Sequence, residues 1–98
     1  MTELILKTTQ PDKVAAVIKQ EIATKIARIE YSRQQVRKKL AYFEQKYDIT
    51  SERFINKWVA EDLEGRDMEY VEWAGEYHYF LYVEEELNIL NSIEYVLQ

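Results

Sequence analysis

Hydrophobic residues recur at helical spacing along most of the chain. From about residue 12 to residue 47 no Gly or Pro interrupts the sequence, and apolar residues return every seven positions, which places them on one stripe of a helix. A helix of about 36 residues is roughly 54 Å long, so it needs a partner along its length. The stripe consists of Ala15, Ile22, Ile29, Val36 and Phe43, with Ile26, Leu40 and Tyr47 four positions after members of the series.

Residues with strong local preferences mark where this helix starts and where the next one begins. Pro11 suits the first position of a helix, where its missing N–H costs nothing. Thr50 or Ser51 suits the capping position of a second helix. Before Pro11, residues 3–7 have a β-like composition, and we expect a short extended segment there.

The rest of the chain predicts a short helix followed by a long one. Residues 51–62 place Phe54 and Trp58 at helical spacing, and Gly65 follows as expected just beyond a helix end. A last helix is predicted over about residues 67–97. Its apolar stripe consists of Tyr70, Trp73, Tyr77, Phe80, Val83, Leu87, Leu90 and Leu97. Gly75 lies within this helix, and we expect it to mark a place where another backbone or a large aromatic ring comes close.

These elements predict a single all-α domain over residues 1–98. Its core is a long helical hairpin made by helices of about 12–47 and 67–97, with a corner helix of about 51–62 and a short extended N-terminal segment. The last helix is expected to run antiparallel along the first, so that each covers the apolar stripe of the other.

Charge divides the chain into a basic first half and an acidic second half. Residues 1–49 hold ten Lys/Arg and six Asp/Glu, and residues 50–98 hold three Lys/Arg and twelve Asp/Glu, giving +4 and −9 for the total of −5. Acidic residues of the last helix should therefore face basic residues of the first. Because +4 cannot neutralise −9, part of the acidic surface is left for another partner.

Composition argues against catalysis and metal binding. The chain has no Cys and one His, which leaves little material for a nucleophile or a metal site. His78 has no Glu three positions before it, because residue 75 is Gly. Glu72 and Glu76 share a helical face, as a pair of carboxylates for acid–base catalysis would. In so acidic a chain, however, such a pair more commonly belongs to a solvated face. We predict a non-enzymatic, cytoplasmic protein without cofactor, metal or membrane-spanning segment.

Aromatic residues are abundant, with eight Tyr, three Phe and two Trp. The tyrosines of the last helix cover too much of its circumference to face one way, and tyrosines left outside beside acids are typical of an interface for a basic partner. The predicted partner-binding residues are Glu72, Glu76, Tyr79, Tyr82, Glu85 and Glu86. The predicted structural residues are Phe43, Tyr47, Phe54, Trp58, Trp73 and Phe80. We also expect the protein to form a homo-oligomer, with its seam along Ile22, Ile29 and Val36.

The middle of the chain carries a further pattern of aromatic and acidic residues. It consists of AYFEQKY at residues 41–47, TSERF at residues 50–54, and Trp58, Asp67, Glu72 and Trp73. Over roughly residues 40–90 the pattern resembles that of short helical proteins of cyanobacteria and archaea regarded as antitoxins of type II toxin–antitoxin pairs. The resemblance implies a protein without catalytic residues that occupies the active surface of a toxin. Gly75, His78 and the N-terminal segment have no counterpart in it.

Three functions follow from these observations. The favoured one is an antitoxin-like inhibitor that binds a basic nuclease-type toxin through the acidic, tyrosine-rich last helix. The first alternative is a self-associating coiled-coil or adaptor protein without a toxin partner. The second, less favoured, is a nucleic-acid-binding regulator that uses basic residues of the first helix. These basic residues are Lys25, Arg28, Arg33, Arg37, Lys38 and Lys39.

Overall fold

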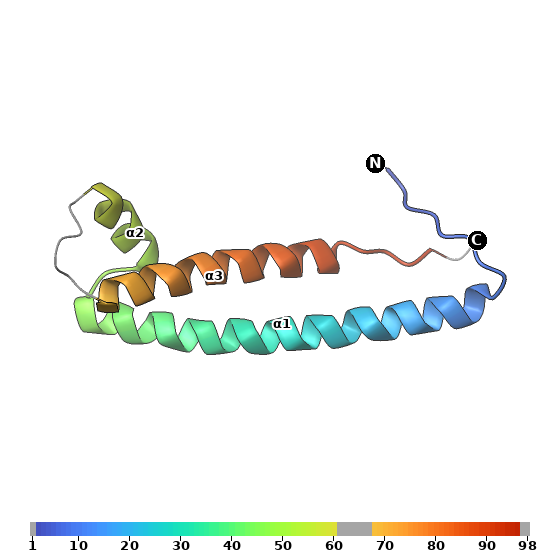
Figure 1. Ribbon diagram of the computed structural model, residues 1–98, viewed down its shortest axis with the longest axis horizontal. Helices are drawn as coiled ribbons and strands as arrows, with labels where there is room; N and C mark the ends of the chain where they lie inside the picture. Colours follow the sequence, from blue (N-terminus) through green and yellow to red (C-terminus); the bar gives the residue numbers. More distant parts are fainter. Residues whose placement is uncertain (1, 61–67, 97–98) are drawn as a thin grey trace.

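The protein is a helical hairpin with a short helix at its closed end (Figure 1). The computed structural model describes residues 2–60 and 68–96, except for the side chains of residues 58–60. This part contains α1 (Pro11–Tyr47), α2 (Ser51–Ala60) and α3 (Met68–Asn91). Helix α3 runs back along α1, and α2 lies beside the end where α1 stops and α3 begins. The predicted all-α hairpin is confirmed.

The molecule is long and thin. Its principal extents are 60 × 25 × 18 Å and its radius of gyration is 19.3 Å. A compact chain of this length would have a radius of gyration of about 13 Å. The described segments before α1 and after α3 both lie toward the open end of the hairpin (Figure 1), and residues 2–8 form no regular secondary structure and are exposed. Two long helices therefore cover only one side of each other over most of their length.

Local chemistry explains where the helices begin and where α1 ends. Helix α1 starts at Pro11, as predicted. It ends at Tyr47, and the capping residue Asp48 adopts the left-handed conformation with φ 52° and donates its backbone N–H to the carbonyl of Glu44. The side chain of Thr50 then accepts the backbone N–H of Arg53 at 3.2 Å. Of the two predicted caps of α2, Thr50 is therefore the one that acts.

Helix α3 ends earlier than predicted. The apolar stripe continues to about residue 97, but the helix stops at Asn91. The Ser92 hydroxyl donates to the carbonyl of Ile89 at 2.6 Å, and the Ser92 backbone N–H bonds to the same carbonyl. These bonds close the last turn and compete with helix continuation. No basic residue in the last turn stabilises the negative helix end. The predicted boundaries at residues 62 and 67 lie outside the described residues.

Ion pairs join α1 to α3, as the charge pattern predicted. Each pair is partly exposed, so each contributes only about 0–1 kcal/mol and mainly favours one alignment of the helices. The pairs among the described residues are Arg33 with Glu84, Lys39 with Glu76 at 3.4 Å, and Lys46 with Glu69 at 2.7 Å. Their order along the helices is that of an antiparallel hairpin.

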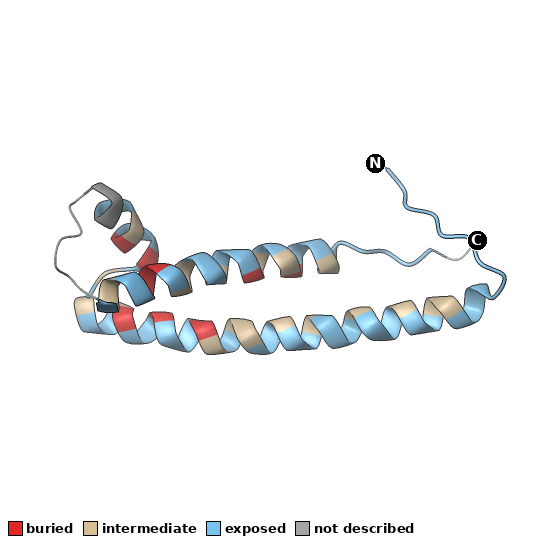
Figure 2. Ribbon diagram, in the orientation of Figure 1, coloured by how far each residue is buried: buried red, intermediate tan, exposed pale blue. Residues whose placement is uncertain are grey.

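Burial is concentrated at the closed end of the hairpin (Figure 2). A core cluster there joins all three helices, and further buried residues continue along the sides of α1 and α3 that face each other. The core cluster contains Leu40, Phe43, Phe54, Trp73 and Ala74. The residues buried further along the hairpin are Val36, Val83 and Leu87.

Gly75 lies on an exposed part of α3, and a Cβ atom built there meets nothing within 4 Å. Among the described residues, neither another backbone nor a large aromatic ring comes close to Gly75, so that expectation is wrong for the single chain. Gly75→Ala should raise the free energy of unfolding by about 1 kcal/mol, because alanine loses less backbone entropy in a helix. Urea unfolding of dilute protein, followed by circular dichroism, measures this change.

The matched control is Ala41→Gly, the reverse substitution at an exposed position of α1. It should lower the free energy of unfolding by a similar amount. An unchanged or lower stability of Gly75→Ala would contradict the conclusion that the space around Gly75 is open.

Candidate functional site

The closed end of the hairpin is built around Trp73, whose side chain is fully buried. Its ring stacks on Phe54 with 3.8 Å between centroids and 4° between planes. The rings of Phe43 and Tyr47 are also nearly parallel to it, at 5.4 and 5.6 Å. Tyr70 meets Tyr47 and Phe54 edge-on, at 5.3 Å from each. This cluster brings aromatic residues of all three helices together and sets how α3 leaves the corner.

A chain of hydrogen bonds also links the three helices at this point. The Trp73 indole N–H donates to the Ser51 hydroxyl at 2.9 Å, and that hydroxyl donates to the Glu44 carboxylate at 2.7 Å. The Ser51 backbone N–H donates to the same carboxylate at 2.8 Å. Because Ser51 is only 2% exposed, a substrate cannot reach its hydroxyl. The arrangement therefore positions the helices.

The two remaining predicted structural residues lie differently. Phe80 is partly buried against the core cluster, and the Arg37 guanidinium lies 5.9 Å from the centre of its ring. Trp58 belongs to α2, but its side chain lies outside the description. Phe80 therefore extends the aromatic packing along α3 toward the middle of the hairpin.

The structure separates the residues predicted to bind a partner. Glu76 turns toward α1 and forms an ion pair with Lys39, so its charge is paired within the chain. Glu85 is exposed on another side of α3. The other four share one side of the helix by their spacing. We call this surface the tyrosine–glutamate flank; it consists of Glu72, Tyr79, Tyr82 and Glu86.

The tyrosines of the flank are open to solvent. Tyr79 and Tyr82 are 44% and 55% exposed, and their rings lie 6.4 Å apart at an angle of 27°. The negative charge of Glu86 and a hydrogen bond with it raise the pKa of Tyr82 above its ordinary value. Glu72 is exposed and forms no ion pair within the described residues.

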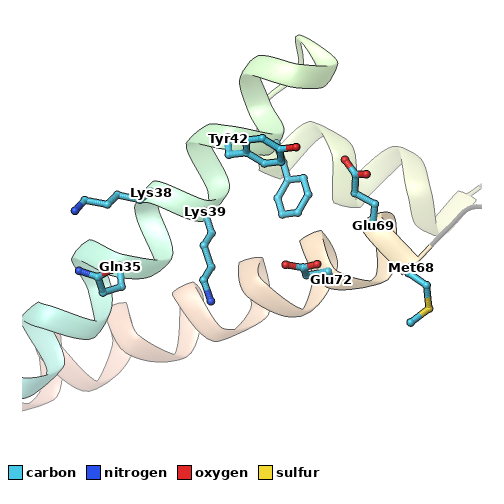
Figure 3. Close-up of a pocket in the computed structure, with 8 residues that line it drawn as sticks. Gln35, Lys38, Lys39, Tyr42, Met68, Glu69 and Glu72 are labelled. Atoms are coloured by element: carbon cyan, nitrogen blue, oxygen red, sulfur yellow. The ribbon is translucent and has the colours of Figure 1, made fainter.

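An open groove of about 600 Å³ lies between α1 and α3 beside the flank. Figure 3 shows Glu72 on the α3 side and Lys38, Lys39 and Tyr42 on the α1 side. The groove is not enclosed, and its lining carries charges of both signs. These properties suit contact with a protein surface better than enclosure of a small apolar ligand.

Glu69, at the end of the groove, accepts hydrogen bonds from the Lys46 ammonium at 2.7 Å and the Tyr47 hydroxyl at 2.9 Å. These bonds lower the pKa of Glu69 below its ordinary value of 4.5. A lowered folded-state pKa contributes stability above the unfolded pKa, and that contribution is lost as pH falls through the folded pKa. The contacts of Glu69 should therefore stabilise the hairpin at neutral pH and weaken in acid.

Glu69→Gln is expected to lower the free energy of unfolding at pH 7 and to have a smaller effect as the pH falls below 4.5. Urea unfolding of both proteins between pH 3 and pH 7, followed by circular dichroism, measures the difference. The control is Glu72→Gln, because Glu72 has no ion pair among the described residues; its effect should be small throughout. A Glu69→Gln effect that does not change with pH would contradict the assignment.

The predicted oligomer seam is partly used within the chain. Val36 is 2% exposed in the single hairpin, whereas Ile22 and Ile29 are half-buried. Nearer the chain end, the Lys19 ammonium lies 5.0 Å from the centre of the Tyr95 ring, so the segment after α3 also runs beside α1. The apolar stripe of α1 is therefore used at least partly for packing within the single hairpin.

Several residues of the basic stretch also contact α3. Arg33 and Lys39 form ion pairs with it, and Arg37 lies over the Phe80 ring. These contacts pair basic residues within the chain, as the charge pattern suggested. They also leave fewer unpaired cationic side chains for binding phosphates.

Sequence reasoning did not find the link from Trp73 through Ser51 to Glu44. Glu44 and Ser51 are seven residues apart across the break between α1 and α2, where helical spacing no longer says which side chains meet. A Ser or Thr at the start of a helix is normally interpreted as its N-terminal cap. The structure instead places Thr50 in that role and buries Ser51 beneath Trp73.

Within residues 2–60 and 68–96, no group of three or more His, Asp or Glu side chains is arranged to hold a metal ion. No helix in this part of the chain is long and apolar enough to cross a membrane. No family model, curated protein or solved structure matches the chain. The antitoxin resemblance therefore stays a prediction from the sequence pattern.

Proposed function

We propose that this protein is a non-catalytic binding protein that recognises a basic protein surface through the tyrosine–glutamate flank of α3. In its specific form, the proposal is an antitoxin-like inhibitor of a basic nuclease-type toxin. The observation that carries it is the pair of exposed rings of Tyr79 and Tyr82, placed between the carboxylates of Glu72 and Glu86.

The distribution of charge supports a basic partner. Basic residues of α1 form ion pairs with three acidic residues of α3, whereas Glu72 has no cationic partner within the described residues. Exposed tyrosines beside carboxylates that have no cationic partner within the described residues match arginine and lysine side chains, since a guanidinium can stack on a ring while it pairs with a carboxylate. Tyrosine is also frequent among residues that dominate binding energy. The acidic residues paired with α1 are Glu69, Glu76 and Glu84.

The antitoxins that the sequence pattern resembles are often encoded beside a small toxin-like protein, so co-expression with the product of the adjacent gene tests the proposal. The two proteins should co-purify, and titration calorimetry should give a dissociation constant at or below the micromolar range that weakens with added salt. The variant Glu72→Lys with Tyr79→Ala should bind at least about tenfold more weakly, because it reverses a charge and removes an anchoring ring.

A matched control carries the same kinds of substitution on α1, at exposed Glu21 and Tyr31. Glu21→Lys with Tyr31→Ala should leave the affinity unchanged within about twofold. Absence of a complex at tens of micromolar would contradict the proposal. Equal weakening by both double variants would show that the flank is not the binding surface.

A further inference from the structure

Helix α3 presents a third surface, on the side that faces away from α1. Val71, Tyr82 and Ile89 are 58%, 55% and 59% exposed there. Figure 2 shows this side of α3 exposed along the helix. Successive positions on it are separated by four, three, four, three and four residues, which is the spacing of a coiled-coil stripe. We call this surface the outer seam; it consists of Val71, Gly75, His78, Tyr82, Glu85 and Ile89.

The surface area of the chain is large for its size. It exposes 8178 Å² at a mass of 11.8 kDa. A compact monomer of that mass exposes about 5,900 Å². The excess of roughly 2,000 Å² is more than the approximately 800 Å² that each partner contributes to a standard stable interface. Part of this excess belongs to the exposed segments at residues 2–10 and 92–96, and part belongs to the outer side of α3, where Val71, Tyr82 and Ile89 are each more than half exposed.

We propose that a second copy of this chain covers the outer seam, with the two α3 helices antiparallel about a two-fold axis near residue 80. The spacing of the seam reads the same from either end, as such an axis requires. Val71 of one copy then faces Ile89 of the other, and His78 faces Tyr82. The two hairpins together form a four-helix array.

The chemistry of each level fits this pairing. The outermost contacts are aliphatic, Val71 with Ile89, and lie about 27 Å apart along the helix. In the middle, the imidazole of His78 meets the Tyr82 ring. Gly75 faces Glu85, and the missing side chain leaves room for the longer one. This also accounts for a mid-helix glycine that no contact within the described chain requires.

The dimer does not depend on the proposed function, although Tyr82 belongs to both surfaces. The experiments for the two proposals therefore leave Tyr82 unchanged. Loss of the dimer is tested with Val71 and Ile89, whereas loss of the basic partner is tested with Glu72 and Tyr79. Each proposal can consequently fail while the other holds.

Light scattering of the isolated chain provides the first test. At about 100 µM the protein should have twice the mass of 11.8 kDa. Val71→Glu with Ile89→Glu should give a monomer of unchanged helicity, because both side chains are already exposed in the hairpin. Val17→Glu with Tyr31→Glu, at exposed positions of α1, should leave the dimer intact.

Cysteine cross-linking tests the antiparallel register, and the chain has no cysteine of its own. Val71→Cys with Ile89→Cys should form a covalent dimer on mild oxidation, because the two positions face each other. Val71→Cys alone should not, since its copies lie about 27 Å apart. A monomeric wild-type protein, a dimer that survives Val71→Glu with Ile89→Glu, or efficient cross-linking by Val71→Cys alone would overturn the proposal.

Discussion

Replacing Trp73 with alanine is expected to lower the free energy of unfolding by about 3–5 kcal/mol. The side chain is fully buried and stacks on Phe54 at 3.8 Å, so its removal leaves a cavity between three helices. A domain of this size is stabilised by about 5–15 kcal/mol in total, and a hairpin with so small a core is expected near the lower limit. Urea unfolding by circular dichroism should show most of the stability lost.

Tyr79→Ala is the control for this substitution. It removes an aromatic ring from the same helix, but at a position that is 44% exposed. Its effect on the free energy of unfolding should stay within about 0.5 kcal/mol. A loss of less than about 1 kcal/mol for Trp73→Ala would show that the aromatic cluster does not hold the closed end together.

Ser51→Ala is expected to lower the free energy of unfolding by about 1–3 kcal/mol, the second largest effect. Ser51 accepts the indole N–H of Trp73 and donates to Glu44, both within hydrogen-bond distance. Alanine fits the space, but it leaves a buried N–H without its acceptor. Chemical unfolding of the wild type and the variant under the same conditions measures the loss.

A double-mutant cycle separates the hydrogen bond from packing. Trp73→Phe removes the indole N–H together with part of the ring, so its cost includes lost volume. If the bond between Trp73 and Ser51 matters, Ser51→Ala should cost less in the Trp73→Phe background, with a coupling of about 1 kcal/mol. Additive effects would show that burial alone accounts for the loss. Thr50→Ala should cost the same in the wild-type and Trp73→Phe backgrounds, since it removes only a cap on α2.

Helix α3 is the element on which both proposals depend. One side packs on α1, the tyrosine–glutamate flank is offered to a basic partner, and the outer seam is offered to a second copy. Apolar side chains around most of a helix are typical of a helix that is enclosed by neighbours. In the single hairpin only one side of α3 has such a neighbour over most of its length, as Figure 2 shows.

Patterns of neighbouring residues were enough to predict the helices and their antiparallel arrangement. The seven-residue recurrence from Ala15 to Phe43 reports one face of a helix, since it depends only on helical geometry. The start at Pro11 and the cap at Thr50 depend on local backbone chemistry. The division into basic and acidic halves indicated the pairing of α1 with α3, because opposite charges at matching positions favour one alignment.

Local patterns were less reliable where a position had competing local or external roles. The stripe of α3 predicted a helix to about residue 97, but Ser92 closes the helix after Asn91 through its own hydroxyl. Gly75 was expected to mark a place where another backbone or a large aromatic ring comes close, and the structure of the single chain shows open space beside it. A glycine in a sequence indicates that a side chain is missing there, but it does not identify a neighbour.

The sequence by itself determined three helices, a hairpin and an excess of acid, because periodicity, caps and charge act over a few residues or add along the chain. Only the tertiary structure decided which acids remain free, since Glu76 is half-buried and pairs with Lys39, whereas Glu72 is exposed and has no ion pair among the described residues. It also decided that Ser51 lies between Glu44 and Trp73. Such contacts join distant positions, and they exist only once the helices have packed in one particular rotation against each other.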